Sequence, residues 1–231
     1  MTYFKNLITT VVFISILFAG QDLESAKIRI KDKNWKEAET FLLKALDHPK
    51  DRWEAAYHLG DKIFPRKQDW VSVKKYMDIA GTAPKGFKIR PTRNDKKIPI
   101  AQAITASITK SYNLIYYKAS NYLPLLNRAS SIEQRNALID QAIQTSMGAK
   151  DLDPAQPGAY ALVALYSSVK GDSETTIEYL DMGLALKDIP EDTKIALLVS
   201  AGQSVVRLGD FDRGLNYYEQ ALAIQPNEPT A

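Results

Sequence analysis

Pairs of small residues, seven positions apart, recur along this chain within stretches of helical apolar spacing. Residues seven apart lie on the same face of an α-helix, about two turns from one another, and small side chains there let a second helix approach closely. The five pairs are Ala38/Ala45, Val73/Ala80, Ala142/Ala149, Thr176/Gly183 and Gly214/Ala221. Their first members are 35, 69, 34 and 38 residues apart. This periodicity predicts a row of repeated helix pairs.

The clearest repeat is residues 195–228. Apolar spacing predicts a first helix over 195–208, a Gly-Asp turn at 209–210 and a second helix over 211–224, which Pro226 ends. We expect small residues at the close approach of the two helices and apolar residues around it. The small residues are Ala201, Gly202, Gly214 and Ala221, and the apolar ones are Leu198, Val205, Leu215, Tyr218 and Leu222.

This stretch resembles the tetratricopeptide repeat (TPR) family, in which helix-turn-helix units carry small residues, an aromatic residue and a closing proline at fixed places. The matching residues are Gly202, Gly214, Tyr218, Ala221 and Pro226. Leu198 stands where the family has an aromatic residue, and Ala201 where it has a leucine. The resemblance implies an all-α, right-handed superhelical array of about five antiparallel helix pairs. It also implies a non-catalytic scaffold for protein–protein interaction in an exported bacterial protein.

The repeats divide the chain into four segments. Residues 1–20 read as a signal peptide, and residues 21–83 as TPR-like helix pairs 1 and 2. Residues 84–99 read as a basic linker, because they hold three prolines, a glycine and six basic residues against one acidic residue. Residues 100–231 read as pairs 3 to 5, of which the first has a long helix over 100–123.

Several helix boundaries have specific signals. A polar residue followed by an aromatic one predicts a helix start at Asn34-Trp35, Asp69-Trp70 and Asp210-Phe211. Pro124 is expected to end the long helix, and Ser131 with Gln134 to form a capping box at the start of its partner. Tyrosines of the long helix serve either core packing or a peptide-binding platform. These are Tyr112, Tyr116, Tyr117 and Tyr122.

The N-terminal segment predicts export. Lys5 supplies a positive end, Leu7–Phe18 a short apolar core and Ala19-Gly20 a small-residue exit. We therefore expect a periplasmic or secreted protein, with retention of the segment as an anchor as the alternative. The chain has no cysteine, which excludes disulfides and a lipoprotein anchor. The net charge of +3 falls to +2 without this segment, which gives no indication of nucleic-acid binding.

The resemblance implies that first helices line a concave groove where protein partners bind. In the last repeats this surface is Ala161, Leu165, Ser168, Val199, Gln203, Val206 and Arg207. The Lys, Arg and Asn set with which some TPR proteins hold a peptide carboxylate is missing there, apart from Arg207. A chaperone-tail receptor is therefore not expected.

The basic segment offers a second contact. Its cations are Lys88, Arg90, Arg93, Lys96 and Lys97. They are either a solvated insertion or a contact to an acidic protein, an anionic glycan or membrane headgroups. Membrane contact is expected only through this segment or an uncleaved N-terminus.

Catalytic and metal-binding patterns are weak. The two histidines are His48 and His58, and His58 with Asp61 supplies too few ligands for a metal. Ser-x-x-Lys occurs at Ser107–Lys110 and Ser167–Lys170 without the companion motifs of penicillin-recognising enzymes. No enzyme activity, metal or cofactor is therefore expected, and a serine hydrolase of this type is the least favoured reading.

Apolar residues are expected at the surface of the last repeat. After Pro226 only five residues remain, so we expect Leu208, Tyr217 and Leu222 to be partly exposed, or covered by a partner or a second copy of the chain. A truncated product is the alternative. The runner-up function is a carrier of a glycan or lipid ligand.

Overall fold

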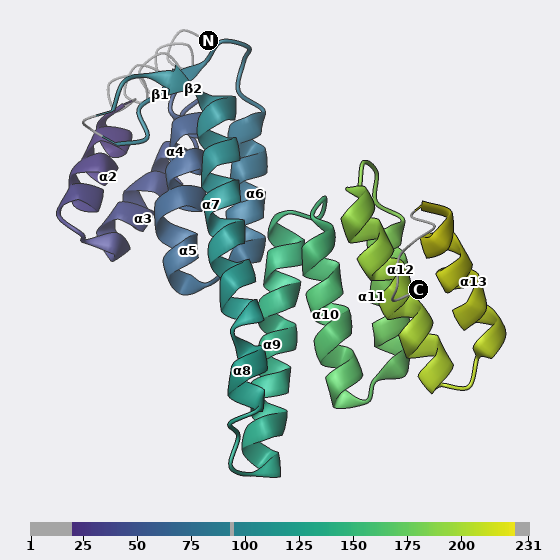
Figure 1. The fold of residues 1–231 in the computed structure, drawn as a ribbon. Helices are drawn as coiled ribbons and strands as arrows, with labels where there is room; N and C mark the ends of the chain where they lie inside the picture. The colour runs from purple at the N-terminus through teal and green to yellow at the C-terminus, as the bar shows by residue number, and fades with distance from the viewer. Residues whose placement is uncertain (1–19, 93–94, 225–231) are drawn as a thin grey trace, which may run out of the picture. The chain divides into compact units, whose positions relative to one another are not determined.

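The computed structural model describes residues 20–92 and 95–224, and within them the chain is almost wholly helical. The predicted signal peptide and Pro226 lie outside the described residues, apart from Gly20. The chain divides into two compact units, one up to Lys110 and one from Ser111. Consecutive helices pack as antiparallel neighbours within each unit, so the predicted fold class, all-α with stacked helix pairs, is confirmed (Figure 1).

The first unit pairs α2 with α3, and then a second, composite helix with α6. The composite helix consists of α4, a π-helical turn η1 and α5. The bounds are α2 Gln21–Lys31, α3 Trp35–Ala45, α4 Arg52–His58, η1 Leu59–Ile63, α5 Phe64–Lys67 and α6 Trp70–Gly81. The long helix α7, Ile100–Ser120, begins in this unit.

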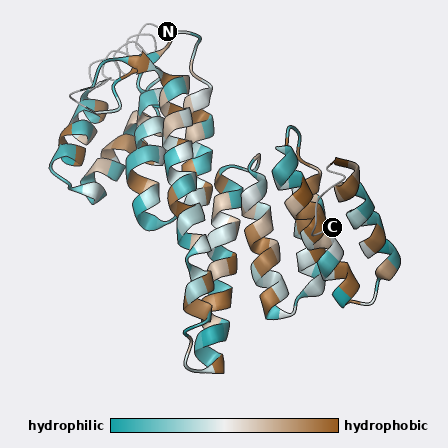
Figure 2. Ribbon diagram, viewed as in Figure 1, coloured by the Kyte–Doolittle hydropathy of each residue, from teal (hydrophilic) through white to brown (hydrophobic). Residues whose placement is uncertain are grey.

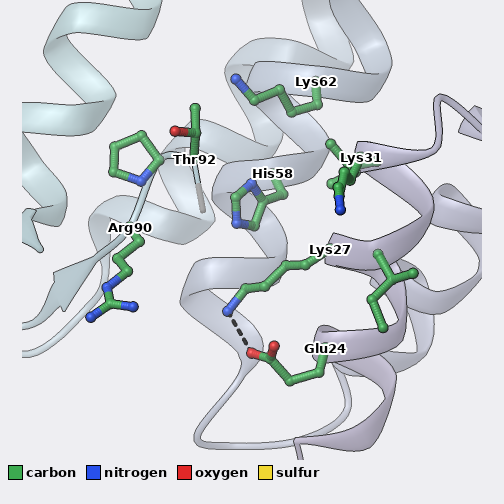
Figure 3. A pocket seen from close by; sticks show the side chains of 10 residues that line it. Glu24, Lys27, Lys31, His58, Lys62, Arg90 and Thr92 are labelled. Carbon is green, nitrogen blue, oxygen red and sulfur yellow. Dashed lines mark hydrogen bonds and ion pairs between the residues drawn. The ribbon is translucent and has the colours of Figure 1, made fainter. Parts of the chain in front are cut away.

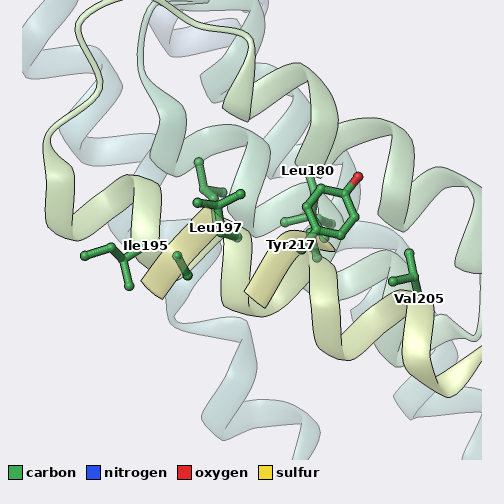
Figure 4. Packing of buried hydrophobic residues seen from close by; sticks show 9 residues of the cluster. Leu180, Ile195, Leu197, Val205 and Tyr217 are labelled. Atoms are coloured by element: carbon green, nitrogen blue, oxygen red, sulfur yellow. The ribbon is translucent and has the colours of Figure 1, made fainter. Parts of the chain in front are cut away.

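The second unit stacks its helices in chain order, α9 on α10, α10 on α11, α11 on α12 and α12 on α13. The bounds are α8 Tyr122–Leu126, α9 Ile132–Leu152, α10 Pro157–Lys170, α11 Ser173–Leu184, α12 Glu191–Arg207 and α13 Phe211–Ile224. One apolar cluster joins α10 to α13, with Leu180, Leu197, Val205 and Tyr217 among its members (Figure 4).

The predicted polar helix starts are confirmed. Asn34, Asp69 and Asp210 each accept a hydrogen bond from the backbone N–H three residues on, at 3.3, 3.0 and 3.1 Å. Asp172 caps α11 in the same way. Such a cap satisfies one of the N–H groups that have no partner within the helix.

The predicted close contacts are also confirmed, because all ten members of the small-residue pairs are buried. The tightest is the crossing of α12 and α13. A Cβ built on Gly202 would lie 2.7 Å from the Tyr218 ring, and one built on Gly214 would overlap Val206 Cγ2. A Cβ at either place would force the facing Tyr218 or Val206 side chain to shift.

Two details of the sequence prediction were wrong. The long helix ends at Ser120, and Pro124 lies inside α8, at its third residue, where a helix N–H has no intrahelical partner and proline is tolerated. In the last pair, Leu215 lies 58% exposed rather than over the helix contact, whereas Tyr217 is buried, with 8% exposed.

Tyr217 is buried because α11 supplies a partner for its hydroxyl. The Tyr217 Oη–H donates to Asp181, and Arg213 Nη2 donates to the second Asp181 oxygen at 2.6 Å. Burial raises the pKa of Tyr217, and the hydrogen bond to Asp181 raises it further. The ring therefore packs inward while its polar end stays hydrogen-bonded.

The segment predicted as a linker contains an antiparallel ribbon, in which β1, Lys88–Ile89, pairs with β2, Ile98–Pro99. Ile89 is buried, and the Phe87 and Trp53 rings meet edge to face at 5.4 Å. The ribbon is thus packed onto the first unit. Within residues 20–92 and 95–224, every helix is too short or too polar to span a bilayer.

Candidate functional site

The seven residues predicted to line a groove lie on α10 and α12. Ala161 and Val199 pack against the apolar cluster of the second unit. Val206 lies against Gly214 at the α12–α13 crossing. The others reach solvent more freely: Leu165, Gln203 and Arg207 are exposed and Ser168 is half-buried.

Three exposed apolar residues lie along one face of α13. Phe211 is 68% exposed, Leu215 58% and Leu222 37%, and the three lie on one face because they are four and seven residues apart. Figure 2 shows hydrophobic and hydrophilic residues alternating along this helix. Leu208, in the turn before α13, is also exposed. We call Phe211, Leu215 and Leu222 the α13 stripe.

The preceding helix shows what normally covers this face. The small-residue pairs place α11 and α13 in register at an offset of 38 residues, so Ile177 and Leu184 of α11 correspond to Leu215 and Leu222. Ile177 and Leu184 pack against the cluster to which Leu197 and Leu198 of α12 contribute. The α13 stripe is therefore the surface that a further helix would cover.

A cavity of about 570 Å³ opens in the first unit between α2, the α4–η1 helix and the residues that follow β1 (Figure 3). Its polar lining is mainly cationic. The charged and imidazole side chains are Glu24, Lys27, Lys31, His58, Lys62 and Arg90. Ile28 and Pro91 supply apolar surface, and Thr92 a hydroxyl.

Carboxylates neutralise two of these cations. Lys27 Nζ lies 2.8 Å from Glu24 Oε1 and 2.8 Å from Glu54 Oε1, and Lys62 Nζ lies 2.6 Å from Asp61 Oδ2. Burial favours a higher pKa for Glu54, but the neighbouring His58 imidazole and the Lys27 ammonium group outweigh it and lower the pKa. Burial alone would lower the pKa of Lys27, but its two carboxylate partners outweigh burial, so the pKa is raised.

His58 is the unusual member of the cavity. It is 3% exposed, and neither ring nitrogen has a hydrogen-bond partner among the described residues. Its Nε2 lies 3.7 Å from Glu54 Oε1, which is beyond hydrogen-bond distance. Leaving a buried polar group unpaired costs about 1–3 kcal/mol.

The two Ser-x-x-Lys sequences do not form nucleophile–base pairs. Ser107 donates to Asp61 Oδ1 at 2.7 Å, while Lys110 is exposed. Ser167 is buried, and Lys170 Nζ lies 2.8 Å from Asp140 Oδ1, a hydrogen bond that raises the pKa of Lys170. A lysine base needs the opposite shift.

The predicted basic contact is only partly brought together at the cavity. Of its residues, Arg90 lines the cavity; Lys88, Lys96 and Lys97 are exposed elsewhere on the ribbon, and Arg93 lies outside the described residues.

The tyrosines of the long helix are mostly covered. Tyr112 and Tyr122 are buried and Tyr116 is half-buried, so of the four tyrosines Tyr117 is the exposed one. Among the described residues, no group of three or more His, Asp and Glu side chains is placed to hold a metal.

Sequence reasoning missed the cavity because its walls come from three separate segments. One available signal was the four-residue spacing of Lys27 with Lys31 and of His58 with Lys62, which puts each pair on one helix face. The π-helical turn that carries Lys62 gave no such signal.

No family model and no curated protein matches this chain. Among solved structures, TTC0263, a thermophilic TPR protein of Thermus thermophilus, is 15% identical, with 90% of this chain and 92% of that chain covered and a TM-score of 0.47. YrrB, a TPR protein with an unusual peptide-binding site, is 15% identical (96% and 94% covered, TM-score 0.42), and MamA from Desulfovibrio magneticus RS-1 is 16% identical (91% and 97%, TM-score 0.40). The chain is similar to TPR proteins. At these identities the similarity concerns the fold alone.

Proposed function

We propose that this protein is a non-catalytic scaffold that binds partner proteins, and that the α13 stripe receives an amphipathic helix of a partner. The observation that carries the proposal is the register between α11 and α13. Ile177 and Leu184 are partly buried against the apolar cluster of the second unit, whereas their counterparts Leu215 and Leu222 are 58% and 37% exposed. Exposed apolar residues gathered on one face commonly mark an interaction site.

The shape and chemistry of the stripe favour a helix as the occupant. The helix that packs next to α11 is α12, which contributes Leu197 and Leu198 to the cluster against which Ile177 and Leu184 lie. A partner helix with apolar residues three and four positions apart would complete the same packing on α13. Leu165, Gln203 and Arg207, exposed on α10 and α12, offer a second surface for the remainder of the partner.

Substitution of the stripe tests this proposal. Leu215→Glu should weaken binding of a partner captured from the native envelope at least about tenfold, because a charge would be buried in an apolar contact. Gln220→Glu is the matched control, since Gln220 is exposed on the opposite face of α13. Both variants should keep the wild-type melting temperature. Equal partner affinity for Leu215→Glu and the wild type would contradict the proposal.

The stripe could instead pair with the stripe of a second copy, which the same variants distinguish. In that case the purified wild-type protein would sediment as a dimer and Leu215→Glu as a monomer. A monomeric wild type that binds a partner only through an intact stripe supports the proposal as stated.

We propose an exported setting, periplasmic or secreted. The support is the charged start, apolar core and small-residue exit of residues 1–20. The intact mass of the protein recovered from the producing cells tests this: export with processing predicts a chain that begins at Gln21. Recovery of the unprocessed chain from the cytoplasm would contradict it.

A further inference from the structure

The cavity of the first unit contains cations with carboxylate partners and cations without them. The proposed scaffold function involves neither group. Lys27 and Lys62 are neutralised by carboxylates, but Lys31 and Arg90 have no ion-pair partner among the described residues. Both side chains line the cavity (Figure 3). Two cations therefore remain available to a ligand.

His58 supplies a second, independent observation. It is almost wholly buried, it lines the same cavity between Lys27 and Lys62, and neither ring nitrogen has a hydrogen-bond partner among the described residues (Figure 3). A buried imidazole is usually hydrogen-bonded. An oxygen atom of a bound ligand would accept the hydrogen of the ring and complete the pairing.

The local backbone explains how His58 and Lys62 come to face one cavity. His58 is the last residue of α4, and Lys62 lies in the π-helical turn Leu59–Ile63 that follows. Phe64 N–H donates to the carbonyl of Leu59, five residues back, just before Pro65, which has no N–H to donate. Single π-turns of this kind recur at functional sites.

We propose that this cavity binds an organic oxyanion. The charged end of the ligand contacts Lys31 and Arg90 and accepts a hydrogen bond from His58, while its apolar part lies against Ile28 and Pro91. The volume of about 570 Å³ suits a small organic molecule. Carboxylate and phosphate oxygens share the required chemistry, namely negative charge and hydrogen-bond acceptance.

Three probes of similar apolar size test the proposal on the purified protein. Isothermal titration should detect binding of phenyl phosphate, benzoate or both, and no binding of the neutral benzyl alcohol. The preferred anion identifies the ligand as a phosphate or a carboxylate. Binding should weaken with added salt, because charge contributes to it. Failure of both anions to bind, or equal binding of benzyl alcohol, would overturn the proposal.

Variants then locate the site. Lys31→Gln and Arg90→Gln should each weaken binding at least about tenfold, and the double variant should abolish it. Both residues are exposed, so these variants should fold normally. Lys88→Gln is the matched control, because Lys88 is an exposed cation on β1 outside the cavity. Unchanged affinity in the double variant would overturn the assignment.

His58→Phe tests the imidazole separately. It removes both ring nitrogens and keeps an aromatic ring, so it should reduce anion affinity without lowering the melting temperature. If the variant binds the anion as tightly as the wild type, His58 has no role in binding; if it fails to fold, Lys31→Gln and Arg90→Gln carry the test. None of these variants touches the α13 stripe, so this proposal and the proposed scaffold function can fail independently.

Discussion

Gly202 and Gly214 allow α12 and α13 to cross closely. A Cβ at Gly214 would overlap Val206 Cγ2, and its next neighbour would be the carbonyl oxygen of Gly202 at 3.4 Å. Gly214→Ala should therefore lower the free energy of unfolding by about 1–3 kcal/mol, because a β-branched side chain in a packed helix contact moves only at a cost. Urea denaturation measures the change.

Gly81→Ala is the control for that prediction. Gly81 is the last residue of α6, and a Cβ there would meet no atom within 4 Å. The substitution should leave stability unchanged or raise it by up to about 1 kcal/mol, because alanine loses less entropy on folding. A Gly214→Ala variant as stable as Gly81→Ala would show that α12 and α13 are not in close contact.

Asp61 should make stability depend on pH in the acid range. Burial favours a higher pKa for the Asp61 carboxyl, but Lys62 and the hydrogen bond from Ser107 outweigh it and lower the pKa below its ordinary value of 3.8. The unfolded chain therefore takes up the proton first as the pH falls. The stabilising contribution is present above pH 3.8 and is lost as the pH falls through the lower pKa of the folded state.

Asp61→Asn should thus be about 1–3 kcal/mol less stable than the wild type near neutral pH, and the difference should shrink as the pH falls below 3.8. Denaturation curves recorded for both proteins across this range check it. A difference that stays constant with pH would show that the carboxyl is not stabilised by Lys62 and Ser107.

At the level of single helices, the aspartate caps should contribute measurably to the free energy of unfolding. Asp172→Ala and Asp210→Ala should each cost about 0.5–2 kcal/mol of stability, because a backbone N–H at the start of α11 or α13 loses its partner. Asp47→Ala, at an exposed position outside any helix, should cost less than about 0.5 kcal/mol. Equal losses at all three positions would contradict the capping role.

The helices whose signals are local could be predicted from the sequence. The bounds of α13 were predicted correctly, because a capping aspartate and helical apolar spacing lie within the segment itself. The break at Asn121 was missed, because Pro124 gave a strong but misplaced stop signal. The inward place of Tyr217 was missed as well, since it depends on Asp181 of another helix.

The cavity could not be predicted for the same physical reason. Lys31, His58 and Arg90 come together only when α2, the end of α4 and the residues that follow β1 are packed. The sequence marked Arg90 as one of several cations, without a means of selecting it over Lys96 or Lys97, which lie outside the cavity lining.

At the scale of the whole molecule, each of the two compact units carries one proposed binding surface. The first unit holds the cationic cavity, and the second holds the α13 stripe. A variant at one site changes no residue of the other site. Its effect on binding of the anion or of the partner helix should therefore be independent of variants at the other site. The proposed scaffold function rests on the second unit.

The most direct test of that function is site-specific photo-cross-linking from α13 in the producing cells. A photoreactive residue at position 215 should link the protein to a partner, and mass spectrometry should map the linked partner residues to one face of an amphipathic helix. The same residue at position 220, on the opposite face of α13, should give no such product. No specific cross-link from position 215, or the same products from both positions, would contradict the account.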